Sequence, residues 1–320
     1  MRAFNETPQM VRESIALENS FTKNGYVIAP RVLGEDKVRA LRTLLADAFR
    51  KIDSQSQSAP QRLFPRHVLS TPQLYSVAFN ERIVDCLKLL LGEQYTLFPD
   101  FHVQRNVFGN ESGPWHTDCG SEGKADYLLA REYRFVKCGV FLQDNTMDWG
   151  GGINVVPGGH RFPIRTPIKT FSFLAKSIAF HAGIRFFSKM LEIRAGDLVA
   201  FDSRLPHRST WPRRKDLRED RYKYVIYWNA SRSDQYVTNF MMNSERRAES
   251  EEVKARSEEI FFSDYLSRHF PTNYSPDFVQ EAGKHNIRVA SLDRTSARAW
   301  SLKFNELMER KNGVSKVTQI

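Results

Sequence analysis

The segment Trp115-His116-Thr117-Asp118 places two metal-binding residue types two positions apart. Alternate residues of an extended strand point to the same side, so His116 and Asp118 can hold one ion between them. His207, in Leu205-Pro206-His207, can supply a third ligand. Two histidines and one carboxylate on one side of a metal, with other positions open, are typical of non-heme Fe(II) oxygenases. The alternative is that His116 and Asp118 only hydrogen-bond each other.

Short apolar runs separated by turn signals surround these residues and would have to position them. Glycine-rich turns such as Gly150-Gly151-Gly152 and Ala195-Gly196-Asp197 divide the runs. Many short strands that close on themselves indicate a barrel or a double-sheet jelly roll. The runs are Tyr95–Phe108, Phe135–Leu142, Ile153–Pro157, Leu191–Ile193, Leu198–Phe201 and Tyr222–Trp228.

Helical patterns flank this β region. A strand is predicted at Tyr26–Ile28, and an apolar stripe from Val38 to Phe49 and a second segment at Asn80–Leu91 predict amphipathic helices. We therefore expect one domain over residues 1–320 that is mainly β with flanking α. Its parts are a helical flank at 18–94, a β core at 95–230 with an insertion at 160–190, and a helical extension at 244–320.

Composition limits the function classes. Apolar residues make up 41% of the chain and charged residues 26%, as in ordinary globular proteins. No apolar run approaches the roughly 18 residues of a membrane span, and the first residues do not resemble a secretion signal. Three scattered cysteines give no disulfide framework, so a cytoplasmic location is predicted. The net charge of +10 allows nucleic-acid binding, but the basic residues are dispersed, which favours solvated faces and anionic small molecules.

Several ordered motifs resemble the phytanoyl-CoA dioxygenase family of Fe(II)/2-oxoglutarate oxygenases. The opening Phe21-x3-Gly25-Tyr26-Val27, the middle segment 139–160 with Gly150-Gly151-Gly152 and Pro157-Gly158-Gly159-His160, and Gly196-Asp197 before His207 are similar to the family's motifs. Gly159 stands where serine is common, and Thr117 stands where glutamine is frequent. The resemblance covers about residues 18–230.

The resemblance implies a double-stranded β-helix (a cupin-like jelly roll) with Fe(II) on His116, Asp118 and His207. The cosubstrates would be 2-oxoglutarate and O2, with release of succinate and CO2. In the family an arginine that begins the strand after the distal histidine binds the far carboxylate of 2-oxoglutarate. Arg221 fits that place, and Arg218 is the alternative. Ser209 matches a hydroxyl that helps to bind the same carboxylate, although a serine there could equally cap a turn.

Related halogenases replace the metal carboxylate with a small residue, whereas Asp118 keeps it, so hydroxylation or another C–H oxidation is expected. The predicted substrate is a small organic molecule, anionic or lipophilic, and no nucleic-acid partner is expected. Three alternatives stay open: a cupin-like metalloenzyme that does not use 2-oxoglutarate, a protein or nucleic-acid hydroxylase, and a non-catalytic ligand-binding module. Lys137 lies on a predicted strand, where it could meet an anion or simply be solvated.

Overall fold

Two β-sheets form the centre of the protein. The computed structural model describes residues 8–54, 62–63, 65–107, 115–119, 128, 132–148, 150–161, 186–210, 213, 222–234, 236–237 and 274–290. Within these residues, a large sheet has the strand order β1-β7-β4-β9-β3-β10, with β2 also paired to β3, and a small sheet has the order β6-β5-β8. Pairing is antiparallel throughout, except that β10 runs parallel to β3.

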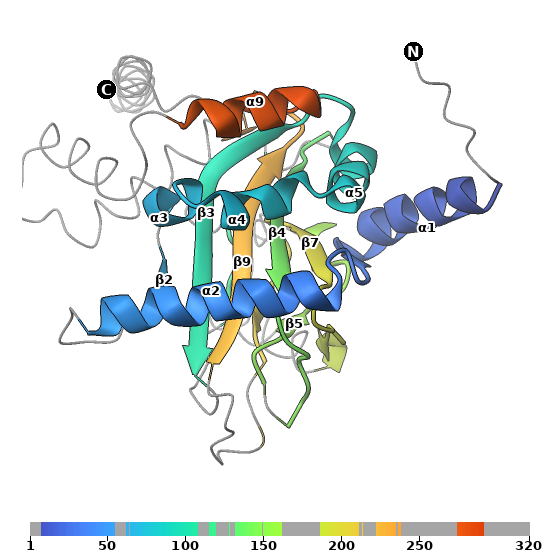
Figure 1. The fold of residues 1–320 in the computed structure, drawn as a ribbon. Helices are drawn as coiled ribbons and strands as arrows, with labels where there is room; N and C mark the ends of the chain where they lie inside the picture. Colours follow the sequence, from blue (N-terminus) through green and yellow to red (C-terminus); the bar gives the residue numbers. More distant parts are fainter. Residues whose placement is uncertain are drawn as a thin grey trace, which may run out of the picture.

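Neighbouring strands of the large sheet are far apart in the sequence, as Figure 1 shows for β3, β9, β4 and β7. The strands are β1 (Tyr26–Ala29), β2 (Arg62–Leu63), β3 (Thr96–Val107), β4 (Phe135–Phe141), β5 (Ile153–Val155), β6 (Lys189–Met190), β7 (Leu198–Asp202), β8 (His207–Ser209), β9 (Tyr222–Ser231) and β10 (Arg288–Val289).

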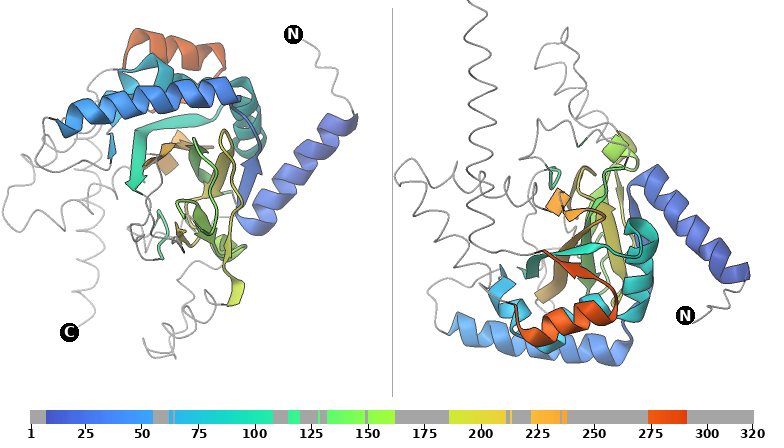
Figure 2. Two further views of the ribbon diagram at one scale, coloured as in Figure 1. Left: turned by 60° about the horizontal axis from the view of Figure 1, so that its bottom comes forward. Right: turned by 90° about the horizontal axis from the view of Figure 1, so that it is seen from above.

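Helices cover one face of the large sheet, and α2 runs across it in Figure 1. The helices are α1 (Pro8–Asn24), α2 (Glu35–Asp53), α3 (Pro65–Leu69), α4 (Pro72–Tyr75), α5 (Glu81–Leu91) and α9 (Pro276–Lys284), with 3-10 turns at Ser76–Phe79 and Gly159–Arg161. Figure 2 shows α2 and α9 on the same side of the sheet, while α1 extends away from the body of the molecule.

The helix sequences explain this layer. In α2 the residues Val38, Leu41, Leu45 and Phe49 recur at three- and four-residue spacing, and all four are buried against the sheet. Acidic residues in the first turn of α2 and basic residues in its last turn complement the helix dipole. Asn80 caps α5 by accepting a hydrogen bond from the Arg82 amide.

The two faces of the large sheet have different environments. On β9, Tyr224, Ile226, Trp228 and Ala230 pack in the helix-covered core. The alternate residues point to the opposite face, where Val225 and Tyr227 join Phe141, Val199 and Phe201 in a second cluster that includes Ile153 and Val155 of the small sheet. The interior between the two sheets is therefore lined by alternate residues of each strand.

This architecture confirms the predicted double-stranded β-helix with flanking helices. The run expected at Leu191–Ile193 is displaced, because β6 covers Lys189–Met190 and only Ile193 makes an isolated bridge, with Asn145. The sequence did not indicate α1 or β10. Most of the expected insertion (residues 162–185) and most of the C-terminal extension lie outside the described residues.

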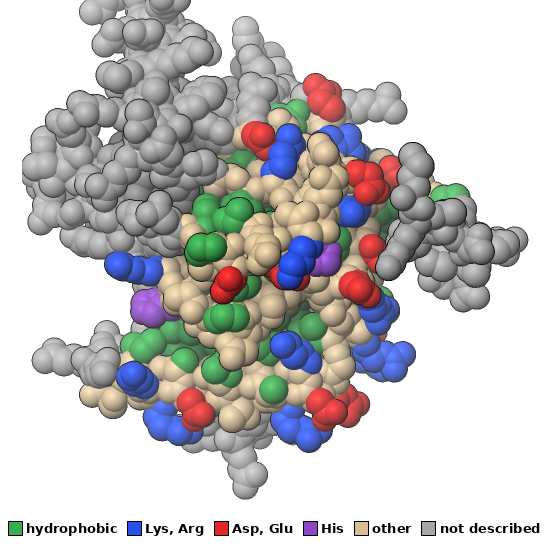
Figure 3. All heavy atoms as spheres, turned by 45° about the horizontal axis from the view of Figure 1, so that its top comes forward, with side chains coloured by type: hydrophobic (Ala, Val, Ile, Leu, Met, Phe, Trp, Pro, Cys, Tyr) green, Lys and Arg blue, Asp and Glu red, His purple; other side chains and the backbone are tan. Residues whose placement is uncertain are grey.

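The surface carries charges of both signs. On the face shown in Figure 3, basic and acidic side chains of the described residues are interspersed and do not gather by sign. This distribution fits the interpretation that the excess basic residues lie on solvated faces of the molecule. Among the described helices, none is both long enough and apolar enough to cross a membrane.

Candidate metal centre

Backbone pairing brings the two predicted histidine ligands together. His116 and His207 form an antiparallel bridge in which each amide donates to the other residue's carbonyl, at 3.0 and 2.9 Å. Their rings lie 4.3 Å apart between centroids. The Cys119 amide also donates to the Ser203 carbonyl, which fixes the chain just beyond Asp118. The segment 115–119 therefore continues the small sheet beside β8.

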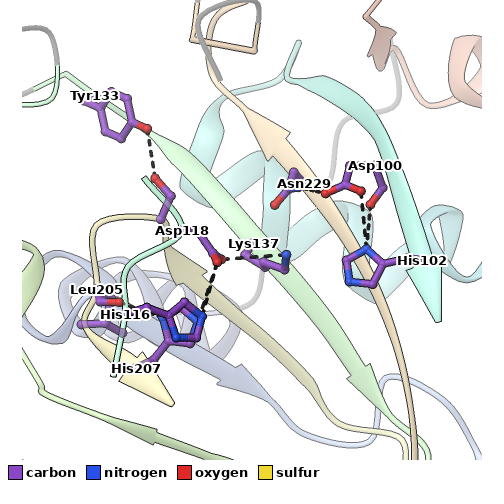
Figure 4. Close-up of polar contacts among 10 residues, drawn as sticks. Asp100, His102, His116, Asp118, Tyr133, Lys137, Leu205, His207 and Asn229 are labelled. Atoms are coloured by element: carbon purple, nitrogen blue, oxygen red, sulfur yellow. Dashed lines mark hydrogen bonds and ion pairs between the residues drawn. The ribbon is translucent and has the colours of Figure 1, made fainter. Parts of the chain in front are cut away.

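The third predicted ligand completes a compact group (Figure 4). Asp118 Oδ1 lies 3.9 Å from Nε2 of His116 and 3.9 Å from Nε2 of His207. One ligand atom from each of the three residues lies within 4.8 Å of the others. Donors that share an ion at about 2.1 Å are about 3 Å apart, so small side-chain rotations would close the group around a metal.

The orientation of His207 is set by its own loop. Its Nδ1 lies 2.9 Å from the Leu205 carbonyl, so Nδ1–H donates there and the lone pair of Nε2 faces Asp118. Burial lowers the pKa of His207 below its usual range, although the Asp118 carboxylate opposes this shift. The ring is therefore neutral near pH 7, which is the form that binds metals.

Asp118 is ionised despite its surroundings. Burial raises the pKa of its carboxyl, but Lys137 and then His207 and His116 more than offset this effect and leave the pKa below its usual value. The Oδ2 atom is buried and accepts no hydrogen bond from another described residue. Lys137 Nζ lies 3.9 Å from Oδ2.

These residues fit a divalent metal ion. Two imidazole nitrogens and a carboxylate oxygen converge, and a buried carboxylate oxygen without a hydrogen bond is costly unless a cation lies nearby. Half of the His116 side chain is exposed (49%), so solutes can reach the group. Three protein donors on one side leave positions free for other ligands, as in the 2-His-1-carboxylate sites of non-heme iron enzymes.

The predicted cosubstrate residues are only partly covered by the structure. Ser209 lies two residues after His207 in β8, so it shares the His207 face of the strand, and it is exposed. Arg221 and the alternative Arg218 lie outside the described residues. Tyr222, which directly follows Arg221, begins β9.

A buried cation on β9, Lys223, was not predicted from the sequence. Lys223 is 2% exposed, and the alternation of β9 puts it on the inner face with Val225 and Tyr227. It lies against Gly151, where an added Cβ would be 2.1 Å from Lys223 Cδ and 2.8 Å from Nζ. The alternation of residues 223, 225 and 227 was a usable signal, because it places Lys223 on the same face as the apolar residue Val225.

Polar side chains continue along the inner face of the large sheet from Asp118 (Figure 4). Lys137 Nζ lies over the Tyr227 ring at 5.4 Å, and the His102 ring is 5.3 Å from that of Tyr227. Asp100 accepts a hydrogen bond from Asn229 at 3.1 Å, and its Oδ1 is 3.6 Å from His102 Nδ1. Burial lowers the pKa of His102, which keeps this ring neutral.

The fold resembles solved enzyme structures. EctD from S. alaskensis with bound Fe is 20% identical, with a TM-score of 0.53, over 71% of this chain and 78% of that chain. The same enzyme with 2-oxoglutarate and 5-hydroxyectoine is 19% identical, with a TM-score of 0.52, over 71% and 77%. At these identities the likeness concerns the fold. No curated protein matches the sequence.

The family model of phytanoyl-CoA dioxygenase matches residues 21–218, which is more than half of the chain. The matched region contains both candidate histidine ligands, Asp118 and the strands that carry them. Membership of this family supports an oxygenase-type activity. The chain belongs to the phytanoyl-CoA dioxygenase family.

Proposed function

We propose that the protein is an Fe(II)- and 2-oxoglutarate-dependent dioxygenase that hydroxylates a small organic substrate. The observation that carries the proposal is the convergence of His116, Asp118 and His207 within 4.8 Å in a chain of this family. Two imidazoles and one carboxylate leave coordination positions open. This fits an Fe(II) centre and differs from a structural zinc site, in which protein ligands occupy every position.

Each ligand residue has a defined task in this proposal. His207 presents Nε2, because Leu205 accepts its other ring proton. Asp118 supplies the anionic donor, and His116 supplies the second nitrogen from a half-exposed side chain. When bound, iron and 2-oxoglutarate activate O2 for oxidation of a substrate C–H bond, with release of succinate and CO2. The protein orients these reactants and limits the access of water to them.

The far carboxylate of 2-oxoglutarate needs a cation. We assign it to the beginning of β9, with Arg221 as the first candidate and Ser209 as a hydroxyl donor. A guanidinium gives bidentate geometry to a carboxylate. Lys223, which is buried on β9 two positions later in the sequence, is the second candidate.

Succinate formation with added Fe(II), 2-oxoglutarate and O2 tests the proposal. We expect wild type to release succinate slowly without substrate and faster with the right small molecule. His116→Ala and His207→Ala should lose at least about a hundredfold of this activity and should bind Mn(II) much more weakly in calorimetry. His67→Ala is the matched control, because His67 is an exposed histidine on α3 and should leave both readouts unchanged.

The outcomes separate the alternatives. Metal binding without succinate release would identify a metalloenzyme that does not use 2-oxoglutarate, and ligand binding without any turnover would identify a binding module. Full turnover in His116→Ala would remove the metal assignment. Arg221→Ala should raise the KM for 2-oxoglutarate about tenfold or more with a smaller change in kcat, and the same experiment on Lys223→Met decides between the two cations.

A further inference from the structure

Lys137 lies beside the candidate ligands on a different sheet. Resting on the proposed function, we propose that Lys137 binds an anionic group, such as a carboxylate, of the primary substrate. Lys137 is on β4, and its side chain points from the inner face of the large sheet towards Asp118 (Figure 4).

Lys137 is held by a long ion pair with Asp118 and by the Tyr227 ring, and by no hydrogen bond at its Nζ within the described residues. Its side chain is 15% exposed, and its nearest described carboxylate, on Asp118, is 3.9 Å away, which is too long for a hydrogen bond. No hydrogen bond joins its Nζ to another residue that the structure describes. The ion pair with Asp118 is therefore a long one, and the largely buried ammonium keeps donors for a closer anion that the described residues do not supply.

A bound metal ion would weaken the pairing of Lys137 with Asp118. The ion would take the Asp118 carboxylate as a ligand, so Lys137 would face both a weakened partner and a divalent cation. The other carboxylate nearby, on Asp100, already accepts a hydrogen bond from Asn229 and lies beside His102. A substrate anion would therefore stabilise the ammonium more in the loaded site than in the empty one.

The position of Lys137 along the sheet distinguishes substrate from cosubstrate. Lys137 pairs with Asn229 near the end of β9, whereas Lys223 is at the beginning of this strand, which Arg221 precedes in the sequence. Six residues of strand span about 20 Å. A 2-oxoglutarate that binds the metal and directs its far carboxylate to the beginning of β9 extends away from Lys137. The ammonium is thus left facing the primary substrate.

Aromatic rings beside Lys137 suggest which probe to use. Phe201 pairs directly with Lys137 across β7 and β4, and its ring is 4.7 Å from that of His207. The Tyr227 ring lies under the ammonium. An aryl acid such as 3-phenylpropionate can therefore place its carboxylate at Nζ while its ring packs on these side chains.

Calorimetry of ligand binding tests the proposal. The protein is loaded with 2-oxoglutarate and with Mn(II) in place of Fe(II), so that no turnover occurs. We expect wild type to bind 3-phenylpropionate about tenfold more tightly than the isosteric 3-phenylpropanamide. Lys137→Met should remove this preference, and Lys137→Arg should retain part of it. Lys189→Met is the matched control, because Lys189 also lies over a tyrosine ring, at 5.7 Å from that of Tyr26, but is exposed on edge strand β6.

The opposing results are distinct. Equal affinity for acid and amide in wild type, or a preserved preference in Lys137→Met, would overturn the role of Lys137. Weaker binding of 2-oxoglutarate itself by Lys137→Met would reassign the residue to the cosubstrate and also overturn the proposal. Failure of wild type to bind Mn(II) would instead count against the proposed function. An unchanged melting temperature and retained Mn(II) binding establish that the variant folds.

Discussion

At the scale of single residues, Gly151 and Lys223 show how tightly the interior is packed. Gly151 has a φ of +80°, a conformation that L side chains rarely adopt, and its Cα faces the buried stem of Lys223. A side chain at position 151 would be strained and would also displace the Lys223 ammonium. The Gly150-Gly151-Gly152 turn is therefore linked to the position of a cation on β9.

Comparing Gly151→Ala with Gly92→Ala separates backbone strain from the steric clash with Lys223. We expect a loss of stability of about 1–3 kcal/mol, because backbone strain and a steric clash act together. If Lys223 holds the cosubstrate, the KM for 2-oxoglutarate should rise as well. Gly92→Ala is the control, since its φ is +99° but no atom of the described residues lies within 4 Å of the added Cβ. Equal stability losses in chemical denaturation would show that crowding at Lys223 is unimportant.

Residue types and spacing predicted the group His116, Asp118 and His207, which the structure brings together. The same reasoning left Lys137 undecided and passed over Lys223. A lysine on a strand can be solvated or buried, and only the pairing of β4 with β7 and β9 puts Lys137 inside. Metal-ligand spacing is a local property, whereas the depth of a lysine is set by distant strands.

At the scale of elements, an ion pair between buried Arg105 and partly exposed Asp53 joins α2 to β3. Arg105 on β3 is 3% exposed and donates to both carboxylate oxygens of Asp53, at 2.7 and 2.8 Å, at the end of α2. Its guanidinium also stacks on the Phe49 ring at 4.3 Å. The hydrogen bonds from Arg105 hold the pKa of Asp53 below its usual value.

Asp53→Asn should therefore destabilise the fold in a pH-dependent manner. A lowered folded-state pKa contributes stability above the unfolded value, about 3.9, and this stability is lost as the pH falls through the folded-state value. We expect a loss of about 1–3 kcal/mol at pH 7 that shrinks below about pH 4. Urea denaturation across this range measures it. Asp47→Asn removes the exposed pair with Arg50 and should cause a much smaller change at every pH.

Secondary-structure elements could be predicted where their signal lies within one short segment of sequence. The stripe in Val38–Phe49 predicted the central part of α2, and the Asn80–Leu91 segment predicted nearly all of α5, because an amphipathic helix carries its signal within its own sequence. β10 has only two residues, and its pairing partner β3 is nearly 200 positions earlier, so no short window could reveal it. Strands this short depend on their partners more than on propensity.

At the scale of the molecule, residues far beyond the family match complete the core. Phe278 on α9 is fully buried, and its ring lies 5.2 Å from Tyr75, 5.4 Å from Phe79 and 5.8 Å from Phe101. The match to the family ends at residue 218. The described part of the C-terminal region is thus built into the helix layer over the large sheet, as Figures 1 and 2 show for α9.

Phe278→Ala should destabilise the whole protein, because α9 shares one core with α4 and β3. Removing the ring leaves a cavity, and such changes cost about 3–5 kcal/mol. The melting temperature should fall in one transition that includes the β-sheet. Val279→Ala, at the adjacent and half-exposed position, should have little effect. A separate transition for α9, with the sheet unchanged, would contradict this expectation.

The parallel pairing of β10 with β3 has a consequence for synthesis on the ribosome. The hydrogen bonds from Arg288 and Ala290 to Tyr95 and Leu97 cannot form until the last of these residues leaves the exit tunnel. Until then the nascent chain presents an open strand edge and uncovered aromatic rings, the features that promote aggregation. Binding of chaperones to the nascent chain should therefore persist until β10 has docked.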